Sequence, residues 1–181
     1  MQHRLLLDSA LLQITIQRLC QQLVENHDDF SKSAIIGLQP RGVFLAERIQ
    51  KVLKEEHAIT ADLGYLDTTF HRDDFRRRDA PKKPSVTKID FLIENRNVVL
   101  VDDVLFTGRS VRAAMDAMIS FGRPNKVELL VLIDRLHARD LPIEATYIGK
   151  KVNTLNSQKV NVNLKEQDGD DTIELINLEE E

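Results

Sequence analysis

The sequence predicts an α/β fold with a mostly parallel central sheet. Short apolar segments alternate along the chain with longer segments whose apolar residues recur every three or four positions, and this alternation is typical of strands joined by helices. Two short segments, Ser33–Leu38 and Val98–Val101, are apolar almost throughout, as strands covered on both faces are. We therefore expect helices on both faces of the sheet, and we treat residues 1–181 as one domain.

The first half of the chain predicts two helices and two strands. Asp8 or Ser9 can cap a helix that runs to about Asn26, because leucine and isoleucine recur there at helical spacing. A strand at 33–38, a helix at Val43–Glu56 and a strand-like stretch at Ile59–Phe70 follow. Residues 71–88 are polar, charged and proline-containing, which predicts a loop. A loop of this length often serves as an active-site lid.

The second half continues the alternation. The expected elements are a strand at 98–101, a helix at Arg109–Phe121, a strand at Lys126–Arg135 and a short strand at Tyr147–Ile148. Near the C-terminus, the segments KVNVNL and TIELINL alternate with a period of two around the turn QDGDD. This pattern predicts a C-terminal β-hairpin.

Composition excludes several classes of protein. The chain is 42% hydrophobic and 30% charged, and none of its apolar runs approaches the roughly 20 residues needed to span a bilayer. Its N-terminus soon turns polar, unlike a signal peptide. The single cysteine, Cys20, excludes an intramolecular disulfide and falls in an apolar helical pattern. We expect a cytoplasmic protein in which Cys20 is a core residue.

Acidic residues are concentrated at the C-terminus. Residues 166–181 hold eight acids and no lysine or arginine, so in the rest of the chain the basic residues outnumber the acids by four. The net charge of −4 therefore does not exclude an anionic ligand or RNA on the remainder of the surface.

The segment VVLVDDVLFTGRS carries the clearest chemistry. Its apolar strand ends in two adjacent acids, Asp102 and Asp103, and a turn containing Thr107, Gly108 and Ser110 leads into the next helix. Carboxylates accept hydrogen bonds from sugar hydroxyls, while hydroxyls and backbone N–H groups at a helix N-terminus hold phosphate. In an open α/β sheet, ligands bind beyond the carboxyl ends of the strands. The segment thus predicts a sugar-phosphate site, against the alternative of solvated acids beside an ordinary helix cap.

This segment resembles the phosphoribosyl diphosphate (PRPP) loop of the type I phosphoribosyltransferases. The segments VRAAMDAM, FGRPNKVELLVLIDR, DLPIEATYIGK and SQKVNVNL are similar to the family of bifunctional pyrimidine-operon regulators and uracil phosphoribosyltransferases. The likeness extends over nearly the whole chain. It implies the type I phosphoribosyltransferase fold and the conversion of uracil and PRPP into UMP and pyrophosphate.

The resemblance also implies roles for individual residues. Asp102 and Asp103 would bind the ribose hydroxyls of PRPP, Arg41 would receive pyrophosphate, and Arg72 in the lid Phe70–Lys83 would reach the substrate. The implied catalytic residues are these four. The implied PRPP loop is Val104, Leu105, Phe106, Thr107, Gly108, Arg109 and Ser110, and the implied pyrophosphate loop is Gln39, Pro40, Arg41 and Gly42. A lysine often found in the pyrophosphate loop is absent here.

The base pocket implied by the resemblance is less well defined. Its expected residues are Asp134, Arg135, Lys151 and Val152, although a surface ion pair between Asp134 and Arg135 is an equal alternative. The next segment departs from the family, with Leu136 where glycine is common and one additional residue before Leu141. The resemblance also implies Mg²⁺ held mainly by the oxygens of PRPP or pyrophosphate, without named protein ligands.

Some members of this family bind the leader RNA of pyrimidine operons when UMP is present. Lys150, Lys151 and Lys159 are candidates for such a face. Glu144 argues against RNA binding, since a basic residue is common at that position in the family. Two alternatives therefore remain, a noncatalytic RNA-binding nucleotide sensor and a phosphoribosyltransferase acting on a purine base. The resemblance also implies a homo-oligomer, either a dimer or a tetramer.

Overall fold

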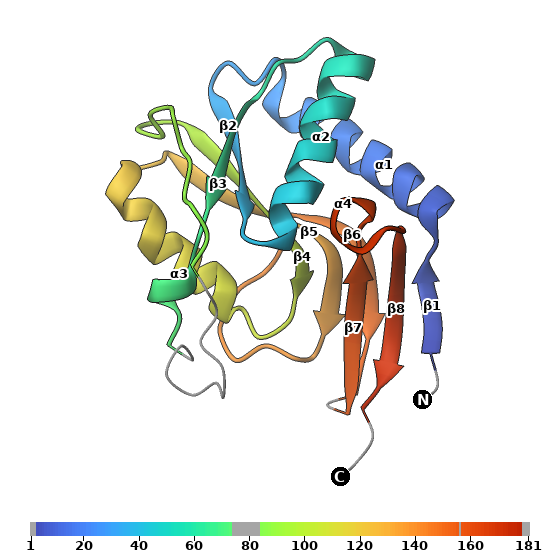
Figure 1. The fold of residues 1–181 in the computed structure, drawn as a ribbon. Helices are drawn as coiled ribbons and strands as arrows, with labels where there is room; N and C mark the ends of the chain where they lie inside the picture. Colours follow the sequence, from blue (N-terminus) through green and yellow to red (C-terminus); the bar gives the residue numbers. More distant parts are fainter. Residues whose placement is uncertain (1–2, 74–83, 156, 179–181) are drawn as a thin grey trace.

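A computed structural model describes residues 3–73, 84–155 and 157–178 (Figure 1). Five strands form a parallel sheet in the order β3-β2-β4-β5-β6. They are β2 (Ser33–Leu38), β3 (Asp62–Leu66), β4 (Asn97–Leu105), β5 (Lys126–Leu136) and β6 (Tyr147–Asn153). The predicted parallel sheet is confirmed. Most of the predicted lid, residues 74–83, lies outside the described residues.

Helices cover both faces of the sheet, as predicted. α1 (Ser9–His27) and α2 (Arg41–His57) share one core with the sheet, and α3 (Arg109–Met118) contributes to a second core on the other face. The backbone N–H of Leu11 donates to the carboxylate of Asp8 at 2.8 Å, which confirms Asp8 as the cap of α1. Cys20 is fully buried, and burial raises its pKa to about 12, as expected of a core thiol. No helix within the described ranges has the length and apolarity to cross a membrane.

Several element bounds differ from those predicted. β4 continues through the two acids to Leu105 because it remains paired with β5 to that point. β3 begins only at Asp62, since Ile59 donates its N–H to Leu53 and thereby helps to end α2. The final turn of the predicted third helix is the 3-10 turn η2 (Ile119–Phe121). β6 is longer than predicted because it pairs in parallel with β5 up to its end.

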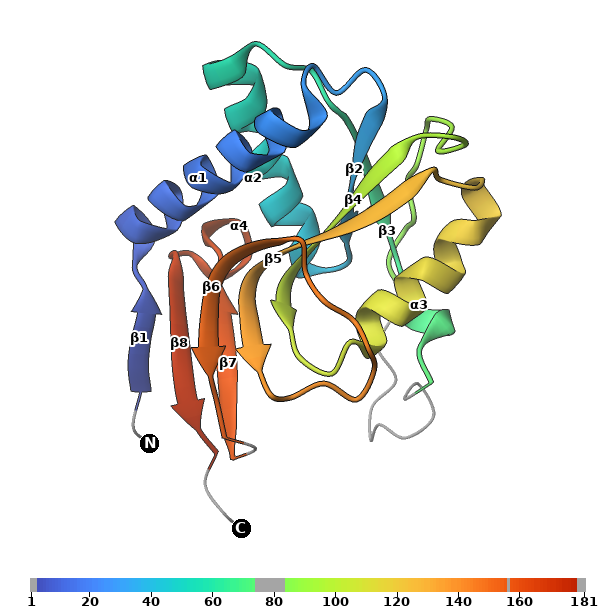
Figure 2. The same cartoon turned by 180° about the vertical axis from the view of Figure 1, so that it is seen from behind.

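A second, antiparallel sheet contains the predicted hairpin (Figure 2). β7 (Gln158–Asn163) pairs with β8 (Thr172–Asn177), and the short helix α4 (Lys165–Asp168) lies between them. β8 also pairs with β1 (His3–Leu7), a strand that the sequence did not predict. The run RLLL does not alternate, and its pairing partner lies at the other end of the chain.

A buried polar cluster lies at the amino ends of the strands. The ring of His27 contacts the hydroxyl of Ser33 at 2.8 Å, the hydroxyl of Tyr147 at 3.1 Å and the carboxylate of Glu128 at 3.1 Å. Burial lowers the pKa of His27, although the Glu128 carboxylate opposes that effect. These contacts join the end of α1 to three strands at the edge opposite the candidate site.

Candidate active site

The candidate site lies where the parallel strands end. β2, β4 and β5 are neighbours that run in the same direction, so the segments that follow them meet at one edge of the sheet. These segments are 39–42, 106–110 and 137–146. The carboxyl edge of an open parallel sheet is the usual position of a ligand site in α/β proteins. The fold therefore brings together the two loops that the sequence predicted as phosphate-binding segments.

Asp102 and Asp103 are half-buried side by side near the end of β4. The N–H of Asp103 donates to the carboxylate of Asp102 at 3.0 Å, and the N–H of Val104 donates to that of Asp103 at 2.8 Å. Burial raises the pKa of Asp102 well above its usual value, and the Asp103 carboxylate raises it further. Burial likewise raises the pKa of Asp103. A hydroxyl donor or a cation would relieve this unfavourable concentration of negative charge.

The turn after β4 forms a small concave site. Gly108 adopts a φ of +91°, a conformation that glycine adopts without strain, and α3 begins at the next residue. A hollow of about 90 Å³ is lined by Arg72, Asp102 and residues 104–111. The guanidinium of Arg72 donates to the hydroxyl of Ser110 at 2.6 Å. This arrangement places a cation, a hydroxyl and a helix N-terminus around one hollow, which suits a phosphate.

In the predicted PRPP loop, the side chains of Arg109 and Phe106 contact residues outside the loop. The guanidinium of Arg109 pairs with the carboxylates of Asp73 and Asp140, the latter at 3.1 Å. The ring of Phe106 is partly exposed, and the guanidinium carbon of Arg135 lies 3.9 Å from its centre. These contacts link the loop to the segments that follow β3 and β5.

The predicted pyrophosphate loop packs closely against β4. A Cβ atom added to Gly42 would lie 2.3 Å from the carbonyl oxygen of Val101, so no other residue fits there without movement. Gln39 and Pro40 are joined by a cis peptide bond. Arg41 starts α2 beside the end of β4, and its positive charge lowers the pKa of Asp103. The loop thus brings a guanidinium to the acid pair.

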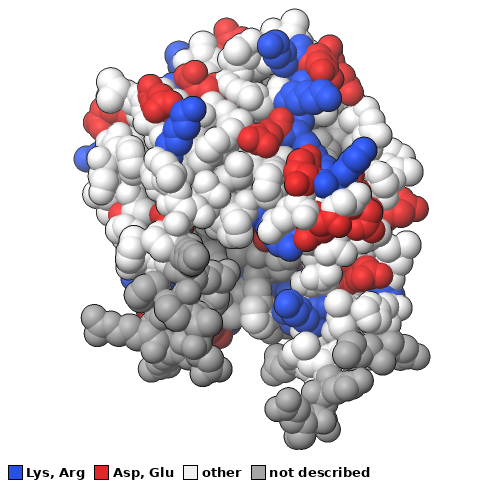
Figure 3. Space-filling view, in the orientation of Figure 1, with Lys and Arg blue, Asp and Glu red and all other residues white. Residues whose placement is uncertain are grey.

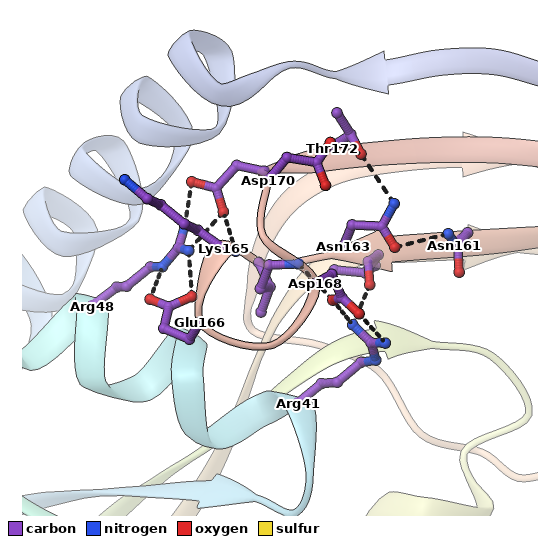
Figure 4. A network of polar contacts seen from close by, with 12 residues as sticks. Arg41, Arg48, Asn161, Asn163, Lys165, Glu166, Asp168, Asp170 and Thr172 are labelled. Carbon is purple, nitrogen blue, oxygen red and sulfur yellow. Dashed lines mark hydrogen bonds and ion pairs between the residues drawn. The ribbon is translucent and has the colours of Figure 1, made fainter.

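Arg41 is also bound by β7 and by the segment between β7 and β8 (Figure 4). Its guanidinium pairs with the carboxylate of Asp168 at 2.7 Å and donates to the carbonyl of Val162. Arg48, two turns further along α2, pairs with Glu166 at 2.5 Å and with Asp171 at 2.6 Å. Acidic and basic side chains are accordingly interleaved over this part of the surface (Figure 3).

The expected base-pocket residues lie at the ends of β5 and β6. Asp134 and Arg135 are each only 5% exposed, so the alternative of a surface ion pair is wrong. Asp134 pairs with Arg139, whereas Arg135 donates to Thr154 at 3.0 Å and to the carbonyl of Gln158 at 2.8 Å. Burial lowers the pKa of Arg135.

The β6 residues of the predicted base and RNA sites have different environments. Val152 is buried and Lys151 is exposed. The ammonium of Lys150 donates to the carbonyl of Leu6 at 2.9 Å, so it links β6 to β1. Lys159, on β7, is exposed. Of the three lysines proposed for RNA, Lys151 and Lys159 therefore present their side chains to solvent.

Sequence reasoning missed two residues that contact the predicted site. Asp168 binds Arg41, and Arg139 donates to the carbonyl of Phe106 at 2.6 Å. Asp168 was assigned only to an acidic tail, because the fold that brings it to α2 was not apparent in the sequence. Arg139 lies in the segment that departs from the family, and that departure was the available signal.

Comparison with known sequences identifies the family. The sequence profile described as Phosphoribosyl transferase domain matches residues 5–167. Bifunctional protein PyrR of Limosilactobacillus fermentum is 38% identical over 174 residues, which cover 95% of this chain and 97% of that protein. A protein of the same name from Desulfosudis oleivorans is 42% identical over 167 residues and 92% of each chain.

Solved structures agree with this assignment at the level of the fold. The hypoxanthine phosphoribosyltransferase of Trypanosoma cruzi matches with a TM-score of 0.73 at 12% identity and covers 97% of both chains. A hypoxanthine phosphoribosyltransferase of Staphylococcus aureus matches with a TM-score of 0.68 at 20% identity, over 94% of this chain and 90% of that one. The predicted phosphoribosyltransferase fold is confirmed, and the chain belongs to the phosphoribosyl transferase domain family, within the group of bifunctional PyrR proteins.

Proposed function

We propose that this protein is a uracil phosphoribosyltransferase that converts uracil and PRPP into UMP and pyrophosphate, with residues 1–181 acting as one domain. The observation that carries the proposal is the half-buried pair Asp102 and Asp103 beside the hollow lined by residues 104–111. A ribose 5-phosphate has hydroxyls at one end and a phosphate at the other. The acid pair suits the hydroxyls, and the hollow at the start of α3 suits the phosphate.

In the proposed reaction, the bond from C1 of the ribose to the diphosphate oxygen breaks while a ring nitrogen of uracil forms the new bond to C1, and the proton of that nitrogen passes to the released diphosphate or to water. Positive charge develops on the sugar ring, and the carboxylates of Asp102 and Asp103 stabilise it. Arg41 and Arg72 stabilise the negative charge that gathers on the departing diphosphate. No covalent intermediate with the protein is required.

The acid pair also fits a bound magnesium ion. Burial raises the pKa of both carboxylates, and a nearby divalent cation would favour their ionised forms. We propose that Mg²⁺ is held mainly by oxygens of PRPP and pyrophosphate and by water, as Mg²⁺ usually is at phosphate sites. The ion would offset charge on the diphosphate.

Uracil is proposed to lie beside the ends of β5 and β6, near Asp134, Arg135, Lys151 and Val152. Because Asp134 is paired with Arg139 and Arg135 is bonded to Thr154 and Gln158, we assign base recognition mainly to backbone groups and to Lys151. The partly exposed ring of Phe106 adds an apolar surface at the same edge.

RNA binding is a second proposed function, supported by the relatives named bifunctional. Exposed Lys151 and Lys159 are the residues proposed to contact pyrimidine leader RNA when UMP is bound. We further propose a cytoplasmic homo-oligomer, a dimer or a tetramer, for both activities.

The base is tested by supplying PRPP and Mg²⁺ with uracil, hypoxanthine or orotate in separate reactions. We expect UMP and stoichiometric pyrophosphate with uracil, and about 10²-fold lower turnover with the other two bases, because a base with mismatched hydrogen-bonding groups leaves buried polar groups unpaired. Turnover of hypoxanthine without turnover of uracil would overturn the assignment of the base. If none of the three bases led to release of pyrophosphate, the proposed phosphoribosyltransferase activity would be overturned.

The acid pair is tested by Asp103→Asn. We expect turnover to fall about 10²-fold or more, because the variant keeps the shape of the side chain and loses its charge. Its pKa is raised in the folded protein, so ionised Asp103 costs stability at neutral pH and the Asn variant should melt at the same temperature or higher.

Asp116→Asn on α3 is the matched control for this substitution. Its carboxylate is half-exposed and pairs with Arg112 outside the hollow. We expect unchanged turnover in this variant. Unchanged turnover in Asp103→Asn as well would show that the pair is merely a solvated strand end.

The role of Arg41 is tested against that of Arg48, since both arginines bind the same turn. We expect Arg41→Ala to reduce kcat/KM for UMP and pyrophosphate at least about tenfold through the KM for pyrophosphate. Arg48→Ala should lower the melting temperature with little change in that KM, because its partners Glu166 and Asp171 lie away from the acid pair. The same kinetic change in both variants would mean that Arg41 only anchors the turn.

RNA binding is tested by filter retention of pyrimidine leader RNA with and without UMP. We expect UMP-dependent retention that weakens as salt rises, and weaker retention by Lys151→Gln and Lys159→Gln, because each lysine would neutralise a phosphate. Lys51→Gln, at an exposed lysine of α2, serves as the control. Absence of retention at low salt would contradict this second function.

A further inference from the structure

The segment between β5 and β6 folds against the loop between β4 and α3. In Figure 2 this orange segment runs beside that yellow-green loop, and hydrogen bonds join the two. The N–H groups of Asp140 and Leu141 donate to the carbonyl of Thr107 at 3.1 and 3.2 Å. The two segments therefore form a single unit at the carboxyl edge of the sheet.

Arg139 is the side chain at the centre of this unit. Its Nη1 donates to the carbonyls of Phe106 at 2.6 Å, Arg135 at 2.9 Å and Leu105 at 3.4 Å. Its Nε donates to the carbonyl of Ile143 at 3.1 Å, and its Nη2 donates to the buried carboxylate of Asp134. With its side chain 23% exposed, the guanidinium joins the end of β4, the end of β5 and its own segment.

These bonds fix the orientation of the backbone in the loop. In a trans peptide unit the carbonyl and the following N–H point in opposite directions. Carbonyls of Leu105, Phe106 and Thr107 that are held toward residues 139–141 therefore direct the N–H groups of the three peptide units away from that segment. Phosphate sites in strand–loop–helix units bind their ligand through such backbone N–H groups.

Two further contacts restrict the loop from the same side. The guanidinium of Arg135 lies over the ring of Phe106 at 3.9 Å. A Cβ atom at Gly108 would lie 3.2 Å from the side chain of Ile143, so the turn is packed closely against this segment. The loop thus has little freedom to turn its carbonyls toward a ligand.

We propose that Arg139 is a positioning residue that holds the loop of residues 105–108 in its phosphate-binding conformation before PRPP arrives. This inference rests on the proposed function, in which that loop binds the 5-phosphate. A preformed loop loses less conformational entropy when the phosphate binds, and the binding is tighter for that reason.

The test compares Arg139→Ala with Arg18→Ala. Arg18 lies on α1 and likewise donates to backbone carbonyls, those of Ile148 and Gly149, but away from the loop. We expect Arg139→Ala to raise the KM for PRPP and the dissociation constant of ribose 5-phosphate about tenfold, with little change in the KM for uracil. Arg18→Ala should change none of these.

A second variant separates positioning from folding, because Arg139→Ala leaves the carboxylate of Asp134 buried without its partner. Asp134→Asn together with Arg139→Ala removes that charge while the loop carbonyls still lack their donor. We expect this double variant to recover melting temperature relative to Arg139→Ala, and its dissociation constant for ribose 5-phosphate, measured by calorimetry, to stay about tenfold above that of the wild type. Arg139→Lys should recover only part of the affinity, since an ammonium has three donors and no fork.

The outcomes distinguish this inference from the proposed function. Binding of ribose 5-phosphate by Arg139→Ala as tight as by the wild type would overturn the positioning role and leave the proposed function standing. An equal rise in both KM values that follows the loss of melting temperature would assign Arg139 a purely structural role. A wild-type protein that binds neither PRPP nor ribose 5-phosphate would overturn the proposed function, and the positioning role with it.

Discussion

The parallel pairing of β2, β4 and β5 is the constraint on which the candidate site depends. Because these strands are neighbours and run in the same direction, the loops that follow them meet at one edge of the sheet. The contact is close, since a Cβ atom at Gly42 would lie 2.3 Å from the carbonyl of Val101. The pairing of the strands alone thereby holds together three parts of the site: the guanidinium at the start of α2, the acid pair of β4 and the segment after β5.

Electrostatics explains why this edge suits a sugar diphosphate. Burial raises the pKa of Asp102 and of Asp103, and each carboxylate has one guanidinium that lowers its pKa, Arg72 for Asp102 and Arg41 for Asp103. Two half-buried carboxylates side by side are costly unless a hydrogen-bond donor or a cation offsets their charge. Ribose hydroxyls would supply such donors to the acids, and the positive charge of the two arginines favours phosphate groups beside them, so this edge favours a sugar diphosphate.

Local patterns predicted most of the sheet, and the long-range contacts account for what was missed. Ser33–Leu38 was correctly bounded because a buried strand is apolar throughout, and the Asp8 cap followed from local chemistry. β1 was missed because its stability comes from pairing with β8, which no local pattern records. Arg139 was missed for the same reason, since its five partners are spread over two strands and the two loops that follow them.

The predicted roles of Arg41 and Asp134 show how such contacts change a functional interpretation. Motif similarity makes Arg41 a cation for pyrophosphate, yet its guanidinium pairs with the carboxylate of Asp168. Both side chains of this pair are about one quarter exposed, and ion pairs in contact with solvent contribute only about 0–1 kcal/mol. A diphosphate carrying several charges competes readily with such a pair, so Asp168 is compatible with the proposed role and keeps the guanidinium at the edge of the site.

Asp134 differs from Arg41 because its ion pair with Arg139 is more deeply enclosed. Its side chain is only 7% exposed, and breaking a buried pair by removing one partner costs about 3–5 kcal/mol. A uracil molecule bound in place of Arg139 would have to offset that cost with a few hydrogen bonds of about 1 kcal/mol each. We therefore propose that Asp134 anchors Arg139 and does not contact the base directly.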